Sequence, residues 1–165
     1  MLKKIHVVVG ILFMFNCCTT YTFAETNLQN DTVAIEIIIQ EVARGWEMAD
    51  ASPFNEHFLG QSGARYIEGG GQNAGLDDLV EHHVIPGGEY LSNFELKVDP
   101  VEIHIEGDVA WAIGDVEVTA TVVEDQRELH SRGYQTILFR KMDAHWKIIH
   151  THSSSRPVKK EERIH

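Results

Sequence analysis

The apolar residues after position 31 recur every three or four residues, which is the period of an amphipathic helix. They are Ile35, Ile38, Ile39, Val42 and Trp46. Asp31 or Thr32 can cap the start of this helix, since a side-chain oxygen there accepts from free backbone N–H groups. The pattern predicts a helix over 32–49. Pro53 predicts a short second helix over 53–58, because proline is tolerated in a first turn.

A third helix is predicted where Leu76, Leu79, Val80 and His83 stand at i, i+3, i+4 and i+7. His83 lies on the apolar stripe, with His82 beside it. Pro86-Gly87-Gly88 is expected to end the helix. A short strand over 64–68 precedes it, and the glycines at 69–71 are expected to break that strand.

From Tyr90 onward the apolar period changes from helical to alternating, which is typical of strands. The expected strands are 94–105 with a bend or bulge at Pro100, then 109–123, 129–142 and 146–154. Consecutive strands joined by short turns form a meander, and helices followed by antiparallel strands indicate the α+β class. A long twisted sheet curves around the helices, so we expect a pocket between the two layers.

The first residues have the features of a secretory signal peptide. Lys3 and Lys4 precede an apolar run, and Thr22-Phe23-Ala24 offers small residues for cleavage. We predict a signal peptide over 1–24, a flexible lead over 25–31, one domain over 32–156 and a charged tail over 157–165. The alternatives are a retained N-terminal anchor and a lipoprotein. Cleavage predicts a periplasmic or secreted protein with no membrane segment left.

Charge and cysteine content exclude several functions. The 165-residue chain suits one domain, and its formal charge of −11 argues against nucleic acid as a partner. Both cysteines lie before Ala24, so the mature chain has no disulfide or thiol chemistry. The glycines at 69–71 lack the Gly-Lys-Ser/Thr of a phosphate loop, and no nucleotide or flavin motif is seen. Of ten histidines, only His6 precedes the cleavage point.

The order of elements and the ending Trp146-Lys147-Ile148-Ile149-His150-Thr151-His152-Ser153-Ser154-Ser155-Arg156 resemble the nuclear transport factor 2-like superfamily. The similarity is greatest to its SnoaL-like and uncharacterised secreted bacterial branch. The resemblance implies a cone-shaped (cystatin-like) fold in which a curved antiparallel sheet packs on three N-terminal helices. It also implies an open pocket and a homodimer through the outer sheet face. The resemblance does not indicate a particular function, because proteins with this fold include enzymes, binding proteins and oligomerisation modules.

The histidines suggest a site in that pocket. His150 and His152 alternate on one strand, so both side chains share a face, which we expect also to carry Trp146 and Ile148. His83, or His82 after a small rotation, would supply a third ligand, and Glu68 a fourth. The group Glu68, His83, His150 and His152 would suit zinc or copper.

The same residues allow two other interpretations. In a ligand-binding or catalytic pocket, one histidine or Glu68 would be a general base, and Tyr66, Tyr134 or Arg132 would stabilise negative charge. Trp111 would line such a pocket. In a structural or interaction module, the polar side chains would only bind one another. The sequence leaves three hypotheses open: a small-ligand pocket with or without acid–base catalysis, a periplasmic metal-binding protein, and a non-catalytic dimerisation module.

Overall fold

The computed structural model describes residues 17–69 and 71–159. Helix α1 spans Cys17–Met48 and α2 spans Ser52–His57. A second helical segment consists of α3 (Leu76–Leu79), a π-helical turn η1 (Val80–Val84) and α4 (Ile85–Tyr90). Within the described ranges, no helix is both long and apolar enough to span a membrane.

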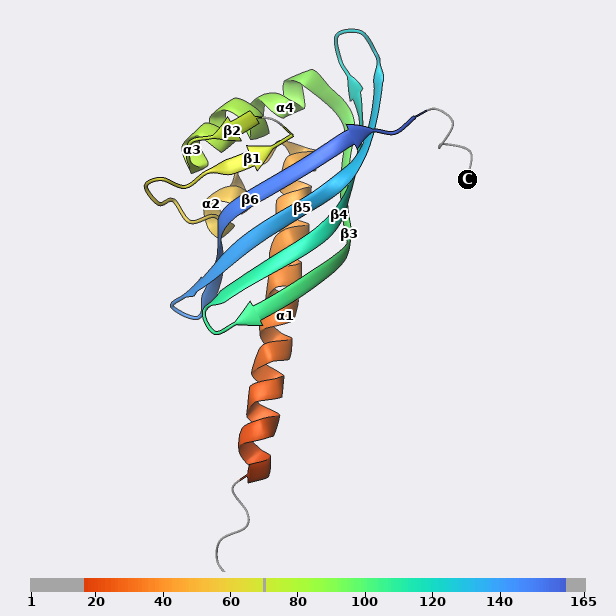
Figure 1. The fold of residues 1–165 in the computed structure, drawn as a ribbon. Helices are drawn as coiled ribbons and strands as arrows, with labels where there is room; N and C mark the ends of the chain where they lie inside the picture. The colour runs from red at the N-terminus through yellow and green to blue at the C-terminus, as the bar shows by residue number, and fades with distance from the viewer. Residues whose placement is uncertain (1–16, 70, 160–165) are drawn as a thin grey trace, which may run out of the picture.

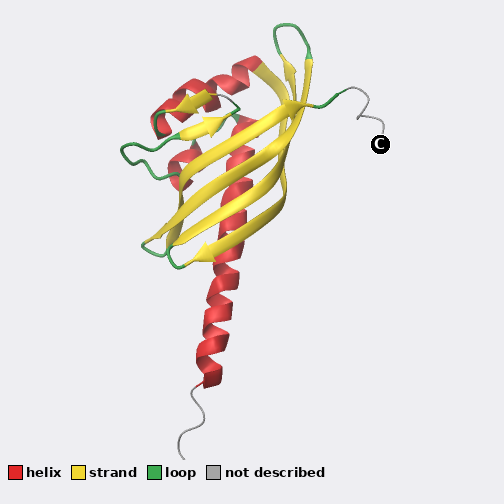
Figure 2. Cartoon of the chain, in the orientation of Figure 1, coloured by secondary structure: helices red, strands yellow, loops and turns green. Residues whose placement is uncertain are grey.

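Six strands form one mixed sheet in the order β2-β1-β6-β5-β4-β3. The strands are β1 (Tyr66–Glu68), β2 (Gly71–Asn73), β3 (Leu91–Glu106), β4 (Val109–Val122), β5 (Glu128–Met142) and β6 (His145–Pro157). The last four are the predicted antiparallel meander, while β1 runs parallel to β6 (Figure 1). Figure 2 shows the helices in a layer on one side of the curved sheet.

The core lies between α1 and the sheet face that it covers, which we call the inner face; the opposite face is the outer face. Four residues of the predicted apolar stripe of α1 are buried there: Ile35, Ile38, Ile39 and Val42. They pack in one cluster with strand residues such as Ala112, Ile137, Phe139 and Ile148. The predicted α+β class is therefore confirmed, and a curved sheet packed on helices is the arrangement that the resemblance implies.

Three local predictions differ from the structure. Helix α1 begins at Cys17 and includes 25–31, the expected flexible lead. The third helix does not end at Pro86-Gly87-Gly88 but continues to Tyr90, because the wider π turn of η1 accommodates a proline without an N–H. Residues 71–73 form a strand that pairs with β1. Residues 1–16 of the predicted leader lie outside the described residues, so cleavage after Ala24 stays a prediction.

One extra residue in β6 changes which of its side chains face the core. Phe139 pairs with Ile148 and Leu138 pairs with His150, so Ile149 has no partner on β5. Such a bulge shifts the alternation of a strand by one position. Before it, Trp146 and Ile148 are buried on the inner face; after it, Thr151 is the buried residue.

Asp31 holds the first part of α1 to the end of the sheet. Its carboxylate accepts hydrogen bonds from Lys141 Nζ at 2.6 and 2.8 Å and from Trp146 Nε1 at 3.0 Å. The side chains of Asp31 and Lys141 are only 20% and 25% exposed. Loss of this carboxylate would leave two part-buried donors unsatisfied.

We therefore expect Asp31→Ala to lower the free energy of unfolding by about 1–3 kcal/mol. Urea denaturation followed by circular dichroism measures this. Asp115→Ala is the matched control, since Asp115 is exposed on β4 and its side chain makes no hydrogen bond or ion pair with the described residues. Equal stability of the two variants would contradict the role of Asp31.

Candidate functional site

A cavity of about 340 Å³ lies between the inner face of the sheet, the end of α1, and the segment from η1 to β3. Its apolar wall comes from Trp46, Leu91, Phe94, Leu96, Val116 and Val118. Its polar groups include Glu47, Glu68, His83, Gln135 and Ser153. A smaller void of about 20 Å³ lies deeper and shares Trp46, Glu68, Leu96 and Gln135 with the cavity. The pocket expected between helices and sheet is therefore present.

Two titratable side chains face each other across this cavity. Glu68 ends β1, and Gly69, with φ of +61°, turns the chain away immediately after it. His83 comes from η1 on the helical side, and its Nδ1 lies 4.0 Å from Glu68 Oε2. Burial raises the pKa of Glu68 from 4.5 to about 7, because its environment disfavours the charged form. The Glu68 carboxyl can therefore take up or release a proton near neutral pH.

Of the two adjacent histidines, only His83 lines the cavity. His82 lies on the exposed side of the helix, where its Nδ1 is 2.7 Å from Asp78 Oδ1, one helical turn earlier. The sequence left the choice between the two histidines open, and the structure places His83, the residue on the predicted apolar stripe, at the cavity.

His150 and His152 do not face the cavity, which corrects the predicted four-ligand group. The bulge at Ile149 places both on the outer face, where His150 Nδ1 lies 2.7 Å from the Arg65 carbonyl oxygen and His152 is exposed. The sheet thus separates them from Glu68 and His83. Within residues 17–69 and 71–159, no group of three or more His, Cys, Asp or Glu side chains could hold a metal ion.

The four other candidate residues also lie outside the cavity lining. Tyr66 is buried, packs edge-on against Phe58 and is 3.3 Å from the Leu59 carbonyl oxygen. Trp111 is on the outer face, stacked on His104 with ring centres 5.0 Å apart. Tyr134 is also on the outer face and 65% exposed.

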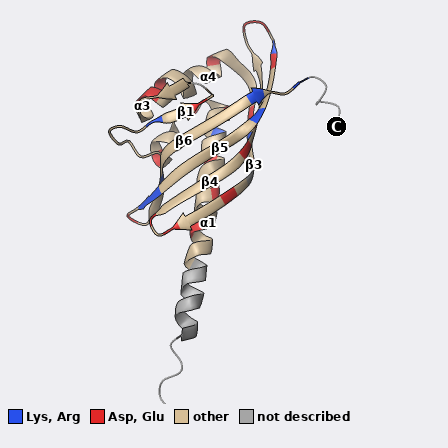
Figure 3. Cartoon of the chain, viewed as in Figure 1, with Lys and Arg blue, Asp and Glu red and all other residues tan. Residues whose placement is uncertain are grey.

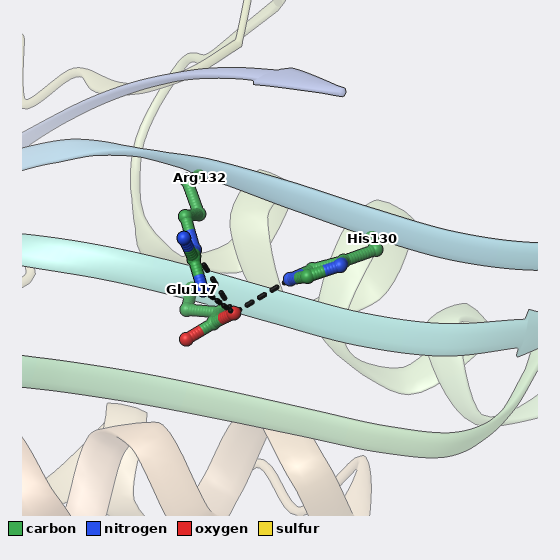
Figure 4. Close-up of polar contacts among 3 residues, drawn as sticks. All are labelled: Glu117, His130 and Arg132. Carbon is green, nitrogen blue, oxygen red and sulfur yellow. Dashed lines mark hydrogen bonds and ion pairs between the residues drawn. The ribbon is translucent and has the colours of Figure 1, made fainter. Parts of the chain in front are cut away.

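Arg132 has a structural partner on the outer face. Figure 4 shows Glu117 between Arg132 and His130: Arg132 Nη2 donates to Glu117 Oε1 at 2.9 Å, and His130 Nε2 lies 2.6 Å from the same oxygen. These contacts, that of His130 first, hold the pKa of Glu117 below its ordinary value. Residues of both charge signs occur along the strands (Figure 3). Arg132 is therefore part of a surface ion-pair cluster.

Two polar residues of the cavity, Gln135 and Ser153, were not singled out from the sequence. The signal for Gln135 was its spacing, because it alternates with Ile137 and Phe139 and so shares their inner face. The spacing in β6 did not indicate Ser153, because the bulge exchanges the faces to which the later side chains of this strand point.

The comparisons identify the family. The model of the SnoaL-like domain matches residues 63–159, more than half of the chain, so the chain belongs to this family. Its fold is similar to that of a nuclear transport factor 2-like superfamily protein from Salmonella enterica serovar Typhimurium. The two are 26% identical, with a TM-score of 0.62, over 77% of this chain and 96% of that one.

Two further solved structures share the fold at lower identity. Hexachlorocyclohexane dehydrochlorinase LinA-type3 from Novosphingobium barchaimii is 18% identical, with a TM-score of 0.69, over 82% of this chain and 95% of that one. A putative ketosteroid isomerase from Shewanella frigidimarina is 20% identical, with a TM-score of 0.60, over 71% of this chain and 91% of that one. A search of curated proteins finds no match.

The raised pKa of Glu68 predicts a pH-dependent stability. Between pH 4.5 and about 7 the folded state holds this proton more tightly than the unfolded state. Stability therefore falls as the pH rises through that window. Glu68→Gln removes the titration, so we expect it to raise the free energy of unfolding by about 1–3 kcal/mol at pH 8 and by little at pH 4.

Urea unfolding of the protein and of Glu68→Gln at both pH values measures this difference. Glu36→Gln, on the exposed side of α1, is the matched control. A gain of the same size at pH 4 and pH 8 would contradict burial of an ionisable carboxyl at Glu68.

Proposed function

We propose that this SnoaL-like protein binds a small, largely apolar molecule in the inner cavity and transfers a proton with Glu68 and His83. The observation that supports this most is the facing pair itself, with 4.0 Å between Nδ1 and Oε2 in a cavity with a mainly apolar wall. The neighbours described as a dehydrochlorinase and as a putative ketosteroid isomerase support a catalytic use of such a pocket.

The chemistry follows from the environment of Glu68. A carboxyl with a pKa of about 7 is partly ionised at neutral pH and is a stronger base than an exposed carboxylate. The wall formed by Trp46, Phe94 and Leu96 keeps water away from a bound molecule, which strengthens electrostatic interactions at the reacting atom. Glu68 would accept the proton, and His83 would take it up or return it.

A general probe of base catalysis tests this proposal without the natural substrate. In 5-nitrobenzisoxazole a base removes a proton from the ring carbon as the N–O bond breaks, giving a coloured phenolate. We expect the protein to accelerate this elimination, with a rate that rises with pH to a plateau above about 7. Glu68→Gln should lower the rate by about 100-fold, and absorbance measures it.

His82→Gln is the matched control, because His82 neighbours His83 but points out of the cavity. It should retain the full rate, whereas His83→Gln should reduce it. If Glu68→Gln retains the full rate, the proposed role of this carboxyl is wrong.

We also propose that two copies pair through the outer face of the sheet. Ile113 on β4 and Tyr134 on β5 are 40% and 65% exposed on this face. Trp111 and Leu138, which pair with each other on the same two strands, also lie on it. Pairing would remove this apolar surface from water. We expect a dimer by light scattering during gel filtration and a monomer for Ile113→Arg, with Ile37→Arg on α1 as the control. A monomeric native protein would contradict the proposal.

A further inference from the structure

Three polar residues of the cavity form a row across three neighbouring strands. Glu68 pairs with Ser153, and Ser153 pairs with Gln135, on β1, β6 and β5. Residues opposite one another in adjacent strands project to the same face, and all three line the cavity. The row therefore places a carboxyl, a hydroxyl and a carboxamide side by side on the inner face.

The lengths of the three side chains give the row a shape. Glu68 and Gln135 have side chains of equal length, and the short Ser153 stands between them. Two strand spacings separate the backbones of the outer pair, roughly 9–10 Å. The result is a notch with a hydroxyl at its base, a carboxyl on one side and a carboxamide on the other. We use the word notch for Glu68, Ser153 and Gln135 together.

The hydrogen-bonding groups of the notch are free. Gln135 and Ser153 make no side-chain hydrogen bond or ion pair with any described residue. Within the described part of the chain, the Glu68 carboxyl has one polar side-chain contact, the 4.0 Å approach of His83 Nδ1. Gln135 and Ser153 are half-buried at the wall of an open cavity, so an acceptor on a bound molecule can take the place of water on their donor groups.

The charge of the cavity narrows the class of that molecule. No lysine or arginine is among the described lining residues, whereas two glutamates are. A carboxylate or phosphate ligand would meet no permanent cation there and would lie close to the two glutamates. An uncharged oxygen acceptor is favoured instead, and the amide N–H of Gln135 and the hydroxyl of Ser153 can both donate to one.

We propose that the notch selects a neutral molecule with a carbonyl oxygen, which Gln135 and Ser153 bind beside the atom that faces Glu68. This inference rests on the proposed function of the cavity and specifies its ligand. Gln135 is thus a specificity-determining residue, and the apolar wall accommodates the ring or chain that carries the carbonyl group.

Binding of two small probes of similar shape tests the notch. The probes are 2-indanone, a neutral ketone, and indane, which lacks the oxygen. We expect 2-indanone to bind about 5- to 10-fold more tightly, the effect of one net hydrogen bond, as measured by chemical-shift titration of the protein. Gln135→Leu should reduce that ratio severalfold, with Ser153 as the remaining donor, while indane affinity is kept or increased. Gln61→Leu, at an exposed loop position, should leave the ratio unchanged.

The outcomes separate this inference from the proposed chemistry. Equal affinities for the two probes, a ratio unaltered in Gln135→Leu, or no saturable binding of 2-indanone would each overturn the notch. Retained indane binding by Gln135→Leu shows that the variant is folded. Elimination of 5-nitrobenzisoxazole that depends on Glu68, together with a ratio of one, would refute the notch alone. A selective ratio with no such elimination would refute only the proton transfer.

Discussion

The bulge at Ile149 determines the composition of the cavity. Because one residue of β6 has no partner on β5, every side chain after it changes face. Thr151 and Ser153 then point inward, and His150 and His152 point outward. Strand β1 pairs with this shifted part of β6, so Tyr66 and Glu68, opposite Thr151 and Ser153, also point inward. Without the bulge, the same pairing would turn an imidazole toward the helices in place of a hydroxyl.

The sequence predicted the elements that have a regular period and missed the place where the period changes. The helix stripe from Ile35 to Val42 and the meander were predictable because burial on one face fixes the spacing of apolar residues. The choice between His82 and His83 stayed open, because the apolar spacing did not fix the rotation of this helix to within one residue. The prediction that His150 faces inward was wrong, because it assumed that side chains alternate between the two faces without interruption through Ile148 and Ile149. Two adjacent isoleucines were the only sign of a slip in that strand.

The cavity has a cost in stability that the rest of the fold offsets. Glu68 lies where burial disfavours its charge, and Gln135 and Ser153 face a hollow without partners. The surrounding core is closely packed: Phe54, Phe58 and Tyr66 form consecutive ring contacts with centres 4.9–5.4 Å apart. Asp31 joins α1 to β6 through its contact with Trp146. Glu41 joins α1 to α2 through its contact with His57. Sites that are destabilising by themselves are retained where function needs them.

The π turn η1 connects this helical layer to the chemistry of the site. It ends two residues before Pro86, where a regular helix would need an N–H that proline lacks. The wider turn lets the helix continue to Tyr90, so that α4 contributes Gly87 and Gly88 to the cavity wall close to His83. A helix ending at Pro86, as the sequence suggested, would leave that side of the cavity without a wall. The same local feature therefore positions the imidazole near Glu68 and adds α4 to one side of the cavity.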